Sequence, residues 1–174
     1  MKKKVTSVTL ILIASIFSIS ILNANILNIG KVYCGDRIEI KGWETVRLTG
    51  IKAPRLDEPM GKEAFEFTKK ELEGKLVEIY TFTTDNTAEG IVRDKEGLAR
   101  VLVRYGHIGH EKKDTSDPSY EKSPDSEQYQ SVDFNALMLI KGLARVDEAF
   151  LPGYLDYYKD LEAIARQEKT GIWK

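Results

Sequence analysis

The chain has 174 residues, which is enough for one domain and little else. Its formal net charge is −1 at pH 7, so bulk charge gives no argument for nucleic-acid binding, and any affinity for phosphate must come from a local patch. The single cysteine, Cys34, excludes an intrachain disulfide. We interpret it as a small buried hydrophobic residue.

The N-terminus has the pattern of an export signal. Three lysines at positions 2–4 precede an apolar run from Val8 to Leu22, and Ala24 offers a small residue for cleavage. We therefore expect a signal peptide over residues 1–24 and a secreted or periplasmic protein, with an uncleaved N-terminal anchor as the alternative. Cleavage would leave a domain over residues 25–174 with 23 basic and 27 acidic residues. We expect this domain to be a monomer that does not contact a membrane.

Short strands come first along the mature chain. Alternating apolar and polar residues predict half-buried strands over 37–41 and 46–50, with a turn at residues 42–43 between them. Segments 76–82 and 98–104 are rich in Val, Ile and aromatic residues and predict two further strands.

Helices are predicted where apolar residues recur at helical spacing. Pro59 suits the first turn of one helix, and Gly74 is placed to end it. Segments 134–138 and 154–165 carry apolar stripes that predict two more helices facing a core. Strands followed by a helix, two further strands and two helices are typical of an α+β, mainly β fold: an OB-type five-stranded Greek-key barrel with three helices.

The segment 106–131 interrupts this pattern, because it is polar and charged with almost no apolar residues. We expect a solvated loop inserted between the last strand and the second helix. His107 and His110 within it could ligate a metal ion. They have no cysteine and no firmly spaced carboxylate beside them, so we favour ordinary loop histidines.

Several short motifs follow one another in a fixed order along the chain. They are GDRI at 35–38, VRLTGIKAPR at 46–55, GKEAFEFTKK at 61–70, DKEG at 94–97, GLARV at 142–146 and KTGIW at 169–173. In this order they resemble the staphylococcal nuclease (thermonuclease-like) family, whose active-site strand reads roughly V-R-L-x-G-I-D-A/T-P-E. The resemblance covers about residues 26 to 174 apart from the insertion, and it implies the same OB-fold.

The resemblance also implies where a catalytic site would lie. Asp36 stands at the first carboxylate ligand of the family's calcium ion, and Arg47 at its first phosphate-clamping arginine. Lys52 stands where the second carboxylate ligand belongs, and Arg55 replaces the glutamate proposed as general base. Leu98 follows Gly97 where the second arginine is expected, and an alignment with a shifted gap puts Glu96 there instead, so this arginine is missing either way.

These substitutions bear directly on the chemistry. Phosphodiester hydrolysis needs an activated water, neutralised phosphoryl oxygens and a stabilised leaving oxygen. Calcium requires several converging oxygen ligands, usually including two or more carboxylates, so Asp36 alone should not hold it. Arg55 cannot act as a base because its guanidinium stays protonated. We therefore expect no cofactor, and we predict that Lys52 pairs with Asp36 as a substitute for the metal ion; Asp57 or Glu58 could serve as a surrogate base.

What remains is a cleft rich in cations. We expect its ligand-binding residues to be Arg37, Arg47, Lys52, Arg55, Arg93 and Lys95. Arg100 could also reach the cleft from nearby. OB barrels bind oligonucleotides across this kind of face, and single-stranded nucleic acid or another anionic ligand is the expected partner. Alternatively, these cations are solvated or paired with neighbouring carboxylates.

Two functions stay open. The first is an exported nuclease-fold protein with lost or much reduced calcium-dependent phosphodiesterase activity, which binds an anionic ligand or a protein partner. The second is an active secreted thermonuclease-like endonuclease that uses calcium and hydrolyses DNA or RNA with a rearranged site.

Overall fold

The computed structural model describes residues 24–83, 90–108, 120–122, 129–150 and 155–174. The expected signal peptide lies outside these residues, except for Ala24 at the start of the first strand. Within the described residues, no helix is long and apolar enough to span a membrane.

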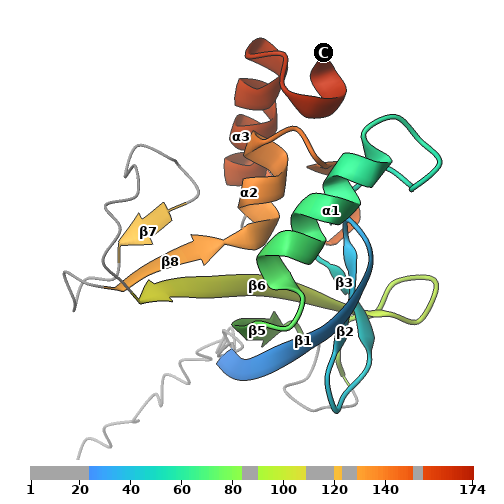
Figure 1. Ribbon diagram of the computed structural model, residues 1–174, viewed down its shortest axis with the longest axis vertical. Coiled ribbons are helices and arrows are strands. Elements are labelled where there is room, and N and C mark those ends of the chain that lie inside the picture. The colour runs from blue at the N-terminus through green and yellow to red at the C-terminus, as the bar shows by residue number, and fades with distance from the viewer. Residues whose placement is uncertain (1–23, 84–89, 109–119, 123–128, 151–154) are drawn as a thin grey trace, which may run out of the picture.

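Five strands close into a barrel (Figure 1). They are β1 (Ala24–Cys34), β2 (Arg37–Ile40), β3 (Thr45–Leu48), β5 (Leu76–Thr81) and β6 (Ala99–Ile108). Antiparallel pairing runs from β3 through β2, β1 and β5 to β6, and a parallel pairing between β3 and β6 closes the circle. The predicted barrel is confirmed.

The hairpin of β2 and β3 shows why the barrel forms where it does. Ile38, Ile40, Val46 and Leu48 point into the barrel and are no more than 1% exposed. Their chain neighbours point outward, because successive residues of a strand alternate between its two faces. The charged residues of this hairpin therefore lie together on the outer surface of the barrel.

Three helices cover one side of the barrel, as the sequence predicts. They are α1 (Gly61–Leu72), α2 (Phe134–Ile140) and α3 (Leu155–Gln167). α1 packs against β1, α2 packs against β6, and α3 packs on α2 (Figure 1). The Asp133 side chain caps α2 by accepting a hydrogen bond from the Ala136 amide at 3.0 Å, and Tyr158 of α3 donates its hydroxyl to the same carboxylate. This capping joins α2 to α3.

The expectation of a continuous loop over 106–131 is wrong in part. β6 continues to Ile108, and two further strands, β7 (Tyr120–Lys122) and β8 (Tyr129–Asp133), add to its free edge. Strand pairing is carried by the backbone, so it does not require the apolar side chains that this segment lacks. His107 lies in β6, and His110 lies outside the described residues.

A close contact between two glycines ties down the end of the chain. The Ile172 amide donates to the Gly142 carbonyl at 2.9 Å, and both Gly142 and Gly171 have positive φ. A Cβ added at Gly171 would collide with the Gly142 carbonyl. This glycine clip seats the 3₁₀ turn η2 (Gly171–Trp173), where the Trp173 ring lies under the guanidinium of Arg166 at 3.9 Å.

Two short elements complete the fold beside the barrel mouth. β4 (Ile51–Lys52) pairs with β9 (Arg145–Val146), and the 3₁₀ turn η1 (Glu148–Phe150) follows β9. β4 therefore leads directly from the charged hairpin of β2 and β3 into the loop before α1.

Candidate functional site

The site is built on the turn between β1 and β2. A Cβ added at Gly35 would overlap the Cβ atoms of Ala53 and Ala64, so only glycine lets this turn approach the segment after β4 so closely. That approach brings Asp36 beside Ala53. The first candidate residue is thus fixed by packing as well as by its own hydrogen bonds.

Two arginines and one glutamate form the outer part of the site. The strand register places Arg37 of β2 opposite Arg47 of β3. Both guanidinium groups contact one oxygen of Glu96, Oε2, and the Arg47 contact measures 3.0 Å. We call these three residues the arginine fork. The hydrogen bond from Arg47 and its positive charge lower the pKa of the Glu96 carboxyl, so Glu96 is ionised in the fork at neutral pH.

The turn after Arg93 positions Glu96. Asp94 Oδ1 accepts hydrogen bonds from the backbone amides of Glu96 at 2.8 Å and Leu98 at 3.0 Å. Leu98, at the position of the missing second arginine, contributes this backbone amide to the turn. The Arg93 guanidinium donates hydrogen bonds to Glu44 at 2.7 Å and to the Gly97 carbonyl at 2.8 Å. It braces the turn against the tip of the hairpin of β2 and β3.

A second group of charges lies beneath the fork. Arg100 of β6 is only 4% exposed, and its guanidinium lies 3.3 Å from Asp147 and 3.9 Å from Asp94. Arg100 also donates to the Leu48 carbonyl at 3.3 Å. We call Arg100, Asp94 and Asp147 the inner cluster. Burial lowers the pKa of Arg100, and the charges of Asp147 and Asp94 oppose this effect.

Asp94 joins the two groups. Its Oδ2 atom lies 3.3 Å from Arg47 of the fork, and its side chain is only 2% exposed. Arg47 therefore sits between the exposed carboxylate of Glu96 and the buried carboxylate of Asp94.

Asp36, at the retained ligand position, is buried and engaged by other groups. The Ala53 amide donates to Oδ2 at 3.2 Å, and the Cys34 thiol donates to Oδ1 at 3.2 Å. Burial, and next the charge of Asp36, raise the pKa of the Cys34 thiol to about 11. Cys34 is half-buried, which corrects the expectation of a simple buried hydrophobic residue.

The predicted pair between Lys52 and Asp36 is wrong. Lys52 is exposed, and among the described residues it makes no ion pair. β4 buries Ile51 and therefore turns the next side chain outward. The oxygens of Asp36 accept hydrogen bonds from the Ala53 amide and the Cys34 thiol instead. Burying these neutral donors costs less free energy than burying the charged ammonium group of Lys52.

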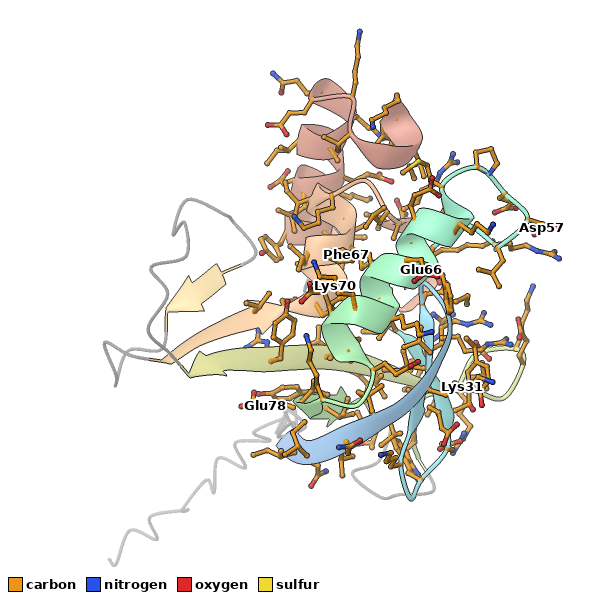
Figure 2. All side chains as sticks on the ribbon, viewed as in Figure 1. Lys31, Asp57, Glu66, Phe67, Lys70 and Glu78 are labelled. Carbon is orange, nitrogen blue, oxygen red and sulfur yellow. The ribbon has the colours of Figure 1, made fainter. Side chains whose placement is uncertain are left out.

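The other altered position, Arg55, lies on the loop between β4 and α1. Arg55 and Asp57 pair at 3.3 Å with about three quarters of each side chain exposed. The Arg55 amide donates to Glu58 at 2.8 Å. Asp57 lies at the tip of this loop (Figure 2). The two carboxylates suggested as surrogate bases are therefore engaged within their own loop.

Charges around the candidate site are largely balanced. Each of the four expected ligand-binding arginines has a carboxylate partner in the described residues: Arg37, Arg47, Arg55 and Arg93. The alternative of paired cations thus holds for them. Lys52 and Lys95 are both exposed. Beneath the fork, the inner cluster adds two carboxylates to one guanidinium.

The side chains present do not suit the calcium ion that the resemblance implies. Asp36 is the one carboxylate left at the ligand positions, and both of its oxygens already accept hydrogen bonds. Within the ranges that the structure describes, no group of three or more His, Cys, Asp or Glu side chains could hold a metal ion. The arrangement is suited instead to holding an anion between two guanidinium groups.

Sequence reasoning missed Glu96 as part of the site. In the sequence, Glu96 is only a residue that can be aligned with the missing second arginine, and a carboxylate there carries no local sign that two arginines from distant strands will meet it. Asp147 was missed for the same reason. Arg100 was expected only as a residue that could reach the cleft, and the register of β6 with β3 places it beside Arg47, where it meets Asp94.

Comparison with known families gives one match. A family model described as a staphylococcal nuclease homologue matches residues 45–174, which is more than half of the chain. The match begins at β3, so Asp36 and Arg37 lie before it. A search of curated proteins found no match.

Proposed function

Because the chain belongs to the staphylococcal nuclease homologue family, we propose that it is an exported, monomeric, nuclease-like protein that binds phosphate groups with the arginine fork and has lost, or nearly lost, calcium-dependent hydrolysis. One observation carries this proposal. Arg37 and Arg47 converge on a single anionic oxygen, while the family's metal and base positions hold Lys52 and Arg55.

The loss of hydrolysis follows from the charges at the metal position. Calcium takes six to eight oxygen ligands, several of them usually carboxylates. Here Asp36 is hydrogen-bonded through both oxygens, and its negative charge acts on the nearby guanidinium of Arg47. A divalent cation would have to displace existing partners and approach a guanidinium, so the site disfavours it.

The retained binding capacity follows from the arginine geometry. Guanidinium groups bind phosphate oxygens through paired, charge-assisted hydrogen bonds. Arg37 and Arg47 lie directly opposite each other on neighbouring strands, so their side chains reach the same point without a change in the barrel. Single-stranded nucleic acid offers such phosphates on the OB face and is the ligand class we favour.

A digestion assay tests the loss of hydrolysis. Residues 25–174 would be incubated with single-stranded DNA and with RNA, in millimolar calcium and in chelator. We expect no cleavage above background. Robust cleavage that chelator abolishes would instead support the second candidate, an active nuclease with a rearranged site, which family membership alone favours.

A restoration experiment tests the explanation for the loss. The double variant Lys52→Asp, Arg55→Glu should gain calcium-dependent thermal stabilisation, because a ligand that binds only the folded state stabilises it. Adding Asp36→Asn to that variant provides the matched control and should abolish the gain. No shift in millimolar calcium would mean that more than two side chains separate this site from a metal site.

A binding assay tests the fork. Fluorescence anisotropy with a labelled single-stranded oligonucleotide at low salt should show binding that Arg47→Gln weakens. Arg93→Gln removes an equal charge from the brace beside the fork and should have the smaller effect. Equal losses would indicate a general electrostatic effect rather than a specific site.

A further inference from the structure

We infer that Glu96 is an internal ligand of the arginine fork, and that it weakens the binding of external phosphates by occupying their position. This inference rests on the proposed function, because it concerns the same site. It adds a second anion, supplied by the protein itself, with which every external ligand must compete.

The geometry of Glu96 is that of a bound ligand. Both guanidinium groups converge on Oε2, one from each of two paired strands. A carboxylate presents to arginine the same pair of acceptor oxygens that a phosphate presents, so one can replace the other. In the structure, the Glu96 carboxylate therefore fills the position that an external phosphate would take.

Glu96 is also able to leave. Its side chain is 45% exposed, and its fixed contacts to the turn are made by its backbone amide, which donates to Asp94. A side-chain rotation would release the carboxylate without breaking that turn. Asp94, by contrast, is 2% exposed and is held under Arg47, so it stays in place when Glu96 moves.

Competition with a tethered carboxylate weakens every external anion by the same factor. A tethered group acts at an effective concentration in the millimolar range or above. Replacing it with a phosphodiester exchanges one negative charge for one, so a dilute diester gains little over Glu96. A phosphomonoester carries about −1.5 to −2 at pH 7, because its second pKa is about 6. It brings nearly one more charge to the two guanidinium groups and therefore binds more tightly than the diester, with or without Glu96.

The test uses two probes that differ by a single methyl group. Phenyl phosphate is a monoester, and methyl phenyl phosphate is the matching diester. Binding of each to the full-length protein would be followed by NMR at pH 8 and low salt. We expect the wild-type protein to bind the monoester about tenfold more tightly than the diester, as one further charge at the site would give.

Glu96→Gln removes the competing charge and keeps the size of the side chain. It should bind both probes more tightly and by a similar factor, because the loss of a common competitor benefits every ligand alike. Glu96→Ala serves as a second variant, because the glutamine oxygen can still accept a hydrogen bond from arginine. The matched control is Glu44→Gln, which breaks the neighbouring Arg93 pair and should leave both affinities unchanged. Thermal melting would confirm that all variants are folded.

The outcomes separate the inference from the proposed function. If neither the wild-type protein nor either Glu96 variant binds any probe, the proposed anion binding itself fails. If the wild-type protein binds the monoester and both Glu96 variants bind it less tightly, Glu96 is a brace for the arginines and the inference is overturned. Unchanged affinities in both Glu96 variants would overturn it as well. A wild-type protein that binds neither probe, beside variants that bind both, supports Glu96 as the competitor.

Discussion

The arginine fork and the inner cluster use the same chemistry at different depths. Both join guanidinium groups to carboxylates, and they meet at the contact between Arg47 and Asp94. The carboxylate of the fork, Glu96, is 45% exposed, whereas the carboxylate shared with the inner cluster is 2% exposed. Water can replace the partners of the first group but not those of the second. The difference in burial therefore separates the arginine fork, which can exchange its anion, from the inner cluster, which stabilises the packing of the strands.

The largest expected effect comes from the inner cluster. Arg100→Leu leaves Asp94 and Asp147 without their guanidinium, and the free energy of unfolding should fall by about 3 kcal/mol. Urea denaturation would measure this change. Arg93→Leu is the matched control on the surface and should cost less than about 1 kcal/mol. Similar losses in the free energy of unfolding for the two variants would contradict the distinction between the buried and the exposed ion pairs.

Asp94 should show an intermediate effect, because it serves both groups. Asp94→Ala removes the acceptor for two backbone amides and the partner of two arginines, and it should cost about 2 kcal/mol. Asp94→Asn keeps an acceptor oxygen and should cost about half as much. The same urea experiment applies. An asparagine variant that is as unstable as the alanine variant would show that charge, not the turn, is the main contribution.

Acid titration should open the fork before the barrel unfolds. Because the pKa of Glu96 is lowered in the folded state, its contribution to stability is present above the ordinary value of about 4.3 and is lost as pH falls through the lower folded value. NMR detection of the Glu96 carboxyl carbon would give this midpoint. Arg47→Gln should raise it toward the ordinary value, and Arg93→Gln should not. A wild-type midpoint at or above 4.3 would contradict the ion pair.

The smallest effect concerns Cys34, which lies beside Asp36 near both groups. With a pKa of about 11, only about one thiol in a thousand is ionised at pH 8. Alkylation by iodoacetamide should therefore be slow at pH 8 and should accelerate as pH rises toward 11. Asp36→Asn removes the second contribution to this shift and should speed the reaction at pH 8, although burial remains. Complete labelling of the wild-type thiol within minutes at pH 8 would contradict the assignment.

The barrel could be predicted from the sequence because its signals are local. Alternation at Ile38, Ile40, Val46 and Leu48 sets both the strands and the inward face. The three helices follow from apolar stripes in the same way. β7 and β8 could not be predicted, because backbone pairing to the edge of β6 leaves no such pattern in the side chains.

The site was harder to predict because its contacts join residues far apart in the chain. Fifty-nine positions separate Arg37 from Glu96, and the identity of each residue alone does not show that they meet. Counting cations near the motif therefore predicted a basic cleft, while the structure pairs its arginines with carboxylates. The identity of Lys52 could be read from the sequence, but its orientation depended on the burial of Ile51 beside it.

The glycine clip has a consequence for the timing of folding. Gly142 lies between α2 and β9, and its partner Gly171 lies beyond α3. A ribosome makes the chain from its N-terminus, so this contact cannot form until residue 171 has left the exit tunnel. The barrel strands are synthesised well before that moment, while the seat of Trp173 between Arg145 and Arg166 must wait. The packing of α2, α3 and η2 therefore stays incomplete in the nascent protein until this segment has been synthesised.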